Sequence, residues 1–364
     1  MKILIINTTT TGKNGITNVI FNYIKAINGS EIVFDLVSRN QPEQLYVDAI
    51  EQKGGRVYYI DKFGSLLKYI WQLSRLIKRN KYDAVHIHGN SHTICIELIG
   101  AWLGRCKKRI VHAHNTSCKS LVAHKTLTGL FNVLCTHGFA CGKAAGEFMF
   151  GNNPFVVINN GVDTDKFAFR QHFRDMYRKE WNVDDNTFVI GHVGSFIKAK
   201  NHEHIIRVFD ALSKKADKYR LIMIGDGELK KTIAEETEML GLQDKVLFTG
   251  NINNVHEVIN AIDVILMPSF FEGLPLTLIE QQANGLKCVV SDNITHESDK
   301  TGNLCFLSLN DPINEWVNAV ETQSVQGDRN IRSKDAIKSI TESGYSIQEQ
   351  AAKLKQEFLK ILKK

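Results

Sequence analysis

Short apolar runs rich in β-branched residues alternate along the chain with segments whose apolar residues recur at helical spacing. In the first half the apolar runs are residues 2–7, 31–38, 56–60, 84–88, 109–114, 138–142 and 155–161. Segments 15–27 and 64–80 lie between such runs and repeat their apolar residues every three to four positions. This alternation predicts a parallel β-sheet covered on both faces by helices.

The same alternation restarts after a polar stretch at residues 163–186. Its apolar runs are residues 187–195, 220–227, 245–250, 263–269 and 287–292, and the chain ends in a strongly helical segment, 346–364. A chain of 364 residues exceeds the size at which one hydrophobic core keeps growing. We therefore predict an α/β fold of two doubly wound, Rossmann-like domains, at residues 1–165 and 166–345. We expect the carboxyl ends of their strands, where ligands of such sheets bind, to face a common cleft.

Composition narrows the class of protein. No apolar run reaches the roughly 18–20 residues of a membrane span, and the apolar part of residues 1–10 is too short for a secretory signal. The seven cysteines form an odd set without a C-x-x-C pair, which favours reduced thiols. We expect a cytoplasmic protein, with a peripheral position on the inner face of the cell membrane as an open option.

Charge is distributed unevenly between the two halves. Residues 1–160 hold 19 Lys and Arg against 9 Asp and Glu, whereas the remainder holds 26 against 30. Two dense basic segments, 75–81 and 104–109, have Trp71 and Trp102 nearby. Solvated faces explain single lysines, but the clustering favours an anionic partner such as a membrane surface or a pyrophosphate-linked lipid. No segment matches a nucleic-acid-binding motif.

The histidines, cysteines and carboxylates are the residues of this chain that could bind a metal ion. His112, His114, Cys118, His137 and Cys141 can be drawn as a zinc cluster, but they lack the closely spaced pairs of structural zinc sites. The D-x-D sequence at 163–165 lies in a linker, so we interpret its two aspartates as loop residues. We expect no metal ion and no cofactor.

In the first half, polar residues follow two predicted strands. Residues 7–18 form a glycine-containing turn that leads into a helix, where Gly15 would let an anion approach free backbone amides, although a plain turn is an equal alternative. His114 ends a predicted strand and is followed by Asn115, so it can reach a ligand. We interpret His86 and His88 as structural residues.

In the second half, Lys198 and Lys200 lie between a strand and a helix entrance, where a phosphate would meet cations and helix amides. The stretch "PSFFEGLPLTLIEQQANG" at 268–285 follows another strand. Its Pro275 suits the first position of a helix, which would leave the amides of Leu276 and Thr277 unpaired and available to a phosphate. The two glutamates that flank this turn are Glu272 and Glu280.

The segment 268–292 closely resembles the signature of the retaining glycosyltransferases of family four, in which seven residues separate two glutamates. The resemblance covers nearly the whole chain, because segments 12–15, 111–117, 157–167, 191–202, 223–230 and 246–255 follow in the expected order. It is closest in character to bacterial capsule and exopolysaccharide enzymes. The resemblance implies a GT-B fold, with the acceptor on the first domain, the nucleotide-sugar donor on the second, and helix 346–364 packing back on the first.

The resemblance also implies roles for the donor-side residues. Glu272 would hold hydroxyls of the donor sugar, and Glu280 would hold the ribose hydroxyls. Lys200 would bind the diphosphate together with the amides of Leu276 and Thr277. The donor site would be completed by four further residues, Lys198, Gly273, Leu274 and Ser195.

Other family roles fall on the loops of both domains. His114 would lie beside the transferred sugar, and Gly15 with Asn115 would face the diphosphate and the acceptor. Asn251 and Ile252 would cradle the base.

One position departs from the family pattern. Ser195 stands where an arginine is common, and losing a bidentate guanidinium at a diphosphate weakens charge stabilisation in the transition state. Lys198 is a candidate to compensate, and without compensation the chain would be a poor or inactive enzyme.

The expected function is metal-independent, retaining transfer of a hexose or N-acetylhexosamine from a nucleotide diphosphate, with UDP as the expected nucleotide, to a saccharide or polyprenyl-diphosphate-linked saccharide. Surface glycan synthesis is the expected setting. Two alternatives stay open, a non-hydrolysing sugar-nucleotide epimerase and a non-catalytic sugar-binding partner subunit. The sequence leaves the donor sugar, the acceptor, the linkage and the oligomeric state open.

Overall fold

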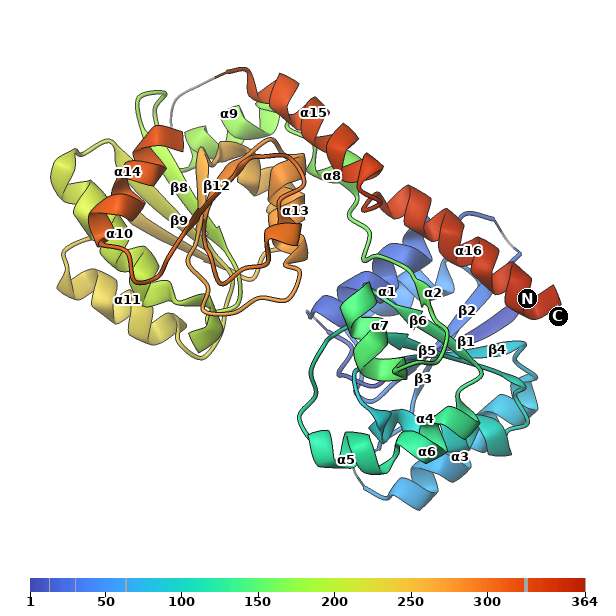
Figure 1. The fold of residues 1–364 in the computed structure, drawn as a ribbon. Coiled ribbons are helices and arrows are strands. Elements are labelled where there is room, and N and C mark those ends of the chain that lie inside the picture. The colour runs from blue at the N-terminus through green and yellow to red at the C-terminus, as the bar shows by residue number, and fades with distance from the viewer. Residues whose placement is uncertain (13, 30, 63, 324–326, 364) are drawn as a thin grey trace. The chain divides into compact units, whose positions relative to one another are not determined.

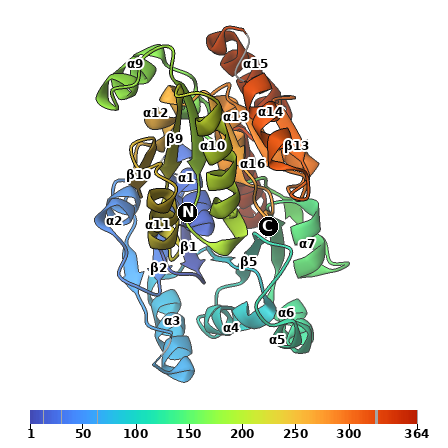
Figure 2. The same ribbon diagram turned by 90° about the vertical axis from the view of Figure 1, so that its left-hand side faces the viewer.

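The computed structural model describes residues 1–12, 14–29, 31–62, 64–323 and 327–363. These residues form two compact units (Figure 1). Unit 1 comprises Met1–Gly161 and Gly344–Lys364, and unit 2 comprises Val162–Ser343. Each unit is an α/β sandwich with helices on both faces of a parallel sheet, so the predicted fold class is confirmed (Figures 1 and 2).

The sheet of unit 1 has seven parallel strands in the order β3-β2-β1-β4-β5-β6-β7. Its central strands are mostly apolar because helices bury both faces, with buried histidines in β4 and β5 as exceptions. The strands are β1 (Lys2–Asn7), β2 (Val33–Ser38), β3 (Val57–Tyr59), β4 (Ala84–His88), β5 (Lys108–Ala113), β6 (His137–Ala140) and β7 (Val156–Val157).

Most helices of unit 1 bury an apolar stripe. In α3 the stripe is Tyr69, Leu73 and Ile77, and the helix begins where the Ser65 side chain accepts a hydrogen bond from the Lys68 amide. The helical elements are α1 (Gly15–Ala26), α2 (Gln44–Glu51), α3 (Leu66–Asn80), η1 (His92–Ile94), α4 (Cys95–Leu103), α5 (Leu121–Thr126), α6 (Thr128–Leu134), α7 (Lys143–Phe150) and α16 (Ile347–Lys363).

The C-terminal helix α16 belongs to unit 1, where it packs beside α1. Its Phe358 is fully buried, and its ring lies 5.4 Å from His86, 6.0 Å from Phe139 and 6.1 Å from Phe34, measured between ring centroids. This part of the unit 1 core is therefore completed by residues distant in sequence.

The sheet of unit 2 has six parallel strands in the order β10-β9-β8-β11-β12-β13. The strands are β8 (Phe188–Val193), β9 (Tyr219–Ile224), β10 (Val246–Gly250), β11 (Val264–Met267), β12 (Lys287–Ser291) and β13 (Leu304–Leu307). The helical elements are α8 (Thr164–Phe167), α9 (Gln171–Glu180), η2 (Lys198–Lys200), α10 (His202–Lys215), α11 (Lys230–Met239), α12 (Val255–Val258), η3 (Ile259–Ala261), α13 (Leu276–Ala283), η4 (His296–Ser298), α14 (Ile313–Gln323) and α15 (Arg329–Glu342).

Several local expectations differ from the structure. The predicted strand 155–161 shrinks to β7, which pairs only with Phe139 and Ala140 at the sheet edge. Strand β13 was not predicted, although its four residues, LCFL, are all apolar; they are only partly buried, at the edge of the sheet. Asp165 lies in the short helix α8 rather than in a loop, and Asp163 caps that helix by accepting a hydrogen bond from the Lys166 amide.

All seven cysteines are free thiols. Within the described residues, no helix combines the length and the apolar character needed to cross a bilayer.

Replacing Phe358 with alanine should destabilise unit 1 by about 3–5 kcal/mol, because the substitution leaves a cavity between α16 and the sheet. Urea titration followed by circular dichroism measures this change in the free energy of unfolding. Gln356→Ala, at an exposed position of the same helix, is the matched control and should change the free energy of unfolding by less than about 0.5 kcal/mol. Equal effects of the two substitutions would show that α16 does not contribute to the core.

Candidate active site

The predicted donor-side residues of unit 2 follow the carboxyl ends of neighbouring strands. Strands β8 and β11 are adjacent, so the segments that follow them, 194–201 and 268–275, lie next to each other. They lie at the end of the sheet where the strands have their carboxyl ends, which we call the carboxyl edge. Two hydrogen bonds join these segments. The Phe270 amide donates to the Ala199 carbonyl at 2.8 Å, and the Asn201 side chain donates to the Pro268 carbonyl at 3.1 Å.

An ion pair joins the two segments at their functional side chains. The Lys200 ammonium contacts the Glu272 carboxylate, and only 15% and 14% of these side chains are exposed. The Ser269 hydroxyl donates to the same carboxylate at 3.0 Å. The sequence predicted a cation and a carboxylate here, and the structure brings them into direct contact.

The N-terminal end of α13 lies next to this ion pair in sequence. The helix begins at Leu276, and Pro275 is its N-cap. The sequence predicted Pro275 as the first helical residue, so the helix begins one residue later than predicted. No side chain caps this end. The amides of Leu276 and Thr277 are therefore available to an anion, where the helix dipole also favours negative charge. Gly273 and Leu274 form the turn that precedes this end, and a Cβ added at Gly273 would meet no atom within 4 Å.

Glu280 lies one helical turn into α13. Its side chain is partly exposed, yet surrounding protein atoms desolvate the carboxyl group and raise its pKa to about 7, against a smaller opposing effect of Lys166. Glu280 is therefore the glutamate of the pair that changes charge near neutral pH.

Four further predicted residues lie around this edge without joining the ion pair. Ser195 follows β8 and is exposed, and Lys198 is exposed in η2. Among the residues that the structure describes, Lys198 makes no ion pair. Asn251 and Ile252 follow β10, which β9 separates from β8, so they lie at the same edge of the sheet but two strands away.

The predicted residues of unit 1 also lie at the carboxyl ends of strands. His114 directly follows β5, and its amide donates to the Asn90 side chain at 2.9 Å. Its Nε2 lies 2.8 Å from Nδ1 of His88. Burial lowers the pKa of His114 to about 4, so the imidazole is neutral at neutral pH. Asn115 is exposed beside it.

Gly15 is the first residue of α1 and is exposed. The Asn14 side chain caps this helix by accepting a hydrogen bond from the Thr17 amide, which already satisfies one of the free amides. A Cβ at Gly15 would meet no atom within 4 Å, so backbone crowding does not require glycine here. Part of the predicted turn 12–15, Lys13, lies outside the described residues.

Sequence reasoning missed three residues that position the site. Ser269 hydrogen-bonds Glu272, and Asn201 hydrogen-bonds the segment that carries Glu272. Each is a polar residue near a strand end or at a helix entrance, and this position in the sequence could have identified them. His88, interpreted as structural, contacts His114 directly. That contact depends on the pairing of β4 with β5, which the sequence does not state.

Two family models together cover most of the chain. Residues 13–166 match the model described as "Glycosyltransferase Family 4", and residues 173–299 match "Glycosyl transferases group 1". The Bacillus subtilis protein EpsF, described as a glycosyltransferase, is 31% identical over 334 residues, which are 86% of each chain. The chain belongs to glycosyltransferase family 4.

Further relatives agree with family 4 membership. The Escherichia coli enzyme "UDP-Gal:alpha-D-GlcNAc-diphosphoundecaprenol alpha-1,3-galactosyltransferase" is 28% identical over 81% of this chain and 80% of its own. The crystal structure of Anabaena Alr3699/HepE in complex with UDP has a TM-score of 0.79 and 16% identity, covering 99% of this chain and 100% of that one. The structural likeness confirms the GT-B fold, and the family 4 match favours glycosyl transfer over epimerisation.

The raised pKa of Glu280 predicts a pH-dependent stability. The folded chain keeps the Glu280 proton up to about pH 7, whereas the unfolded chain loses it near pH 4.5, so the free energy of unfolding falls as pH rises between these values. Glu280→Gln removes this loss. The variant should gain about 1–2 kcal/mol relative to the wild type between pH 5 and pH 8, allowing for partial exposure.

Urea titrations of both proteins at the two pH values measure this difference. Glu238→Gln, at an exposed position of α11, is the control and should follow the wild type at both pH values. A constant difference between Glu280→Gln and the wild type from pH 5 to pH 8 would contradict the raised pKa.

Proposed function

We propose that this family 4 glycosyltransferase moves a hexose or N-acetylhexosamine from a UDP-sugar to a lipid-linked saccharide, with retention at the anomeric carbon. The observation that carries the proposal is the meeting of Lys200, Glu272 and the uncapped end of α13 at one edge of the unit 2 sheet. The UDP in the HepE complex and the UDP-galactose donor in the name of the E. coli relative support the choice of nucleotide.

The donor would bind at the carboxyl ends of β8, β10 and β11. Its diphosphate would accept hydrogen bonds from Lys200 and from the amides of Leu276 and Thr277, because an ammonium and helix-start amides favour an anion. Glu280 would accept hydrogen bonds from the ribose hydroxyls. Glu272, held by Lys200 and Ser269, would accept hydrogen bonds from hydroxyls of the sugar.

The transfer step exchanges one bond at the anomeric carbon for another. The bond from this carbon to the UDP oxygen breaks as the bond to the acceptor oxygen forms on the same face, and the departing diphosphate takes the proton of the acceptor hydroxyl. Lys200 and the α13 amides would stabilise the negative charge that develops on the leaving group. These protein groups could do this without a divalent ion, so we propose metal-independent transfer and no cofactor.

The acceptor side of the proposal rests on unit 1. His114 is neutral and follows β5, so its side chain would accompany the transferred sugar, with Asn115 and Gly15 nearby on the acceptor side. The name of the E. coli relative includes an acceptor linked through a diphosphate to undecaprenol. A lipid-linked acceptor of this kind suits the basic character of the first half of the chain.

A membrane-facing surface on unit 1 would give access to such an acceptor. Helix α4 packs against both α3 and α6 (Figures 1 and 2). Each of these three helices has exposed large apolar side chains. Leu67 is 81% exposed, and Trp71 and Trp102 are 56% and 57% exposed. Exposed cations accompany them, at Lys78, Arg79, Arg105 and Lys107. We name the face formed by these seven residues the α3–α4 face and propose that it contacts an anionic bilayer surface.

Substitution of the two glutamates tests the donor roles. Glu272→Ala should lower kcat by at least about a hundredfold, because it removes contacts to the reacting sugar. Glu280→Ala should mainly raise the donor KM, because its contacts to ribose are the same in the ground and transition states. Product is measured by mass spectrometry with a panel of UDP-sugars and polyprenyl-diphosphate-linked N-acetylglucosamine.

Glu238→Ala controls for loss of a surface carboxylate and should leave both constants unchanged. Mild and equal effects of Glu272→Ala and Glu280→Ala would contradict the assigned roles. Because Ser195 replaces the common arginine, a non-catalytic partner subunit is the second candidate, and absence of both UDP binding and transfer would favour it. Epimerisation of a UDP-sugar without acceptor would instead identify an epimerase.

Vesicle binding tests the α3–α4 face. The double substitution Trp71→Ser and Trp102→Ser should weaken partition to phosphatidylglycerol vesicles by at least about tenfold, because it removes two aromatic anchors. Met239→Ser, which changes an apolar residue of unit 2 that is 81% exposed, should have no effect. Sedimentation with vesicles at low and high salt measures the partition, and equal binding to neutral vesicles would exclude the electrostatic part of the contact.

A further inference from the structure

Four histidines gather in the core of unit 1 on two adjacent strands. His86 and His88 belong to β4, His112 belongs to β5, and His114 follows it. The strands pair so that His88 lies opposite His112, and alternate residues of a strand point to the same face. The ring centroids of His86 and His88 are 4.1 Å apart, and those of His88 and His112 are 5.1 Å apart.

Three of these imidazoles are buried, and each has at least one ring nitrogen without a hydrogen bond. His86, His88 and His112 are at most 3% exposed. Within the described residues, Nε2 of His86, Nε2 of His88 and both ring nitrogens of His112 make no hydrogen bond of normal geometry, although the backbone of Ile158 lies close enough to His112 to favour its charged form. A buried polar atom without a partner costs about 1–3 kcal/mol, and native proteins contain few of them. Several such atoms side by side require a physical explanation.

The charge state of the rings suits metal ligation. Burial disfavours the charged imidazolium form of all three rings. Neutral imidazoles carry a lone pair on one ring nitrogen, which is the form that binds a metal ion.

The spacing of the rings is also close to that of a metal site. One ring nitrogen from each of His86, His88 and His112 can be chosen so that all three lie within 4.8 Å of one another. In a tetrahedral zinc site with bonds of about 2.0–2.1 Å, ligand nitrogens lie roughly 3.4 Å apart. Binding of one ion would therefore require the three rings to move closer together.

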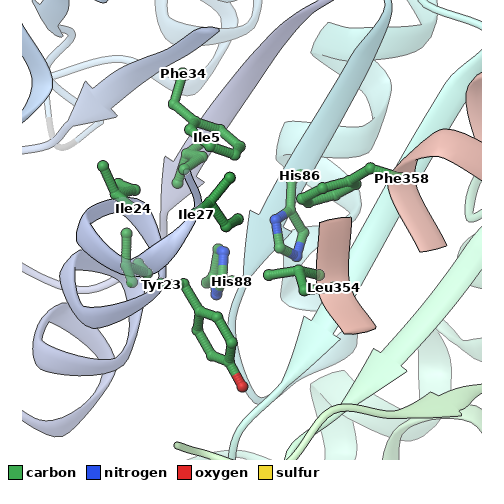
Figure 3. Close-up of a pocket in the computed structure, with 10 residues that line it drawn as sticks. Ile5, Tyr23, Ile24, Ile27, Phe34, His86, His88, Leu354 and Phe358 are labelled. Atoms are coloured by element: carbon green, nitrogen blue, oxygen red, sulfur yellow. The ribbon is translucent and has the colours of Figure 1, made fainter. Parts of the chain in front are cut away.

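A small cavity adjoins two of the histidines and offers room for a fourth ligand (Figure 3). His86 and His88 line it together with apolar side chains that include Leu354 and Phe358 of α16. About 10 Å³ is available to the centre of a water molecule, which is room for one water. His112 does not line this cavity, so a water there would leave the His112 nitrogens unsatisfied. A metal ion between the three rings accounts for all three side chains.

We propose that His86, His88 and His112 bind one transition-metal ion in the core of unit 1, with zinc as the best match to three imidazoles and one water. Imidazole nitrogen suits zinc, copper and nickel, whereas calcium and magnesium require oxygen ligands. The site differs from a metal at the donor diphosphate, because the histidines lie within the unit 1 sheet. The zinc cluster considered from the sequence is a different one, of which only His112 belongs to the site proposed here.

The bound ion would also fix the orientation of His114. A metal on Nε2 of His88 leaves the proton of that ring on Nδ1, which then donates to Nε2 of His114 at 2.8 Å. His114 would consequently keep its own proton on Nδ1. This consequence for a residue beside the sugar rests on the proposed function, whereas metal binding itself does not.

Cobalt titration of the full-length, untagged chain tests the site. The protein is treated with a chelator, dialysed and titrated with Co²⁺, whose visible absorption bands are intense when three or more protein ligands surround it tetrahedrally. We expect bands that saturate at about one Co²⁺ per chain and disappear when Zn²⁺ is added. Zinc should also raise the melting temperature of the wild type, because it binds only the folded chain.

Substitutions locate the bound ion. His86→Phe and His112→Phe keep an aromatic ring in the core and should each lower Co²⁺ affinity by at least about tenfold. His192→Phe changes a fully buried histidine of unit 2 whose Nε2 is also unpaired within the described residues, and it should leave Co²⁺ binding unchanged. Near-UV circular dichroism reports whether each variant is folded.

Three results would overturn the proposal. The first is a wild type that shows no Co²⁺ bands and has retained no zinc. The second is unchanged bands in both His86→Phe and His112→Phe. The third is loss of the bands in His192→Phe. The wild-type titration decides the question even if the unit 1 variants do not fold. UDP binding by the same protein, measured separately, shows whether the donor site is intact, so failure of the metal site and failure of the proposed function are distinguishable.

Discussion

The contact between Lys200 and Glu272 is the interaction on which the carboxyl edge of the unit 2 sheet depends. Opposite charges that are mostly shielded from water attract strongly, and removing one would leave the other uncompensated in a partly desolvated position. The contact joins the segments that follow β8 and β11. Because these strands are parallel neighbours, their carboxyl ends lie side by side, although β9 and β10 lie between them in the sequence. The order of the strands therefore brings Lys200 close to Glu272, and their ion pair holds together the two segments that follow β8 and β11.

Hydrophobic pattern predicted the sheets well where strands are buried on both faces. Residues 2–7 and 84–88 match β1 and β4 residue for residue, because a buried parallel strand is mostly apolar. The prediction failed at sheet edges, where β7 is shorter than predicted and the four apolar residues of β13 were not recognised as a strand. It also misplaced the start of α13 by one residue, since a proline that suits the first helical position fits the N-cap as well.

The candidate site was predictable as a set of residues but not as a set of contacts. Position after a strand placed Glu272, Lys200 and His114 at the carboxyl ends of strands, where the structure also has them. The partners of these residues depend on strand order and register, which a single sequence does not contain. The contact of His88 with His114 arises only because β4 pairs with β5. The same register places His112 opposite His88, so the histidine cluster was also beyond sequence reasoning.

With serine at position 195 instead of the common arginine, the carboxyl edge of the unit 2 sheet depends more on Lys200 for positive charge. A guanidinium offers five N–H donors, whereas an ammonium offers three, and Glu272 occupies part of that capacity. A diphosphate at this edge would therefore share Lys200 with a carboxylate, and backbone amides at the start of α13 would supply the remaining hydrogen bonds. Amides carry no formal charge and need no reorganisation, because the helix fixes their direction. In the proposed donor site, stabilisation of the leaving group would thus depend on the direction of these amides as well as on Lys200, and the turn at Gly273 and Leu274 directly precedes them in the chain.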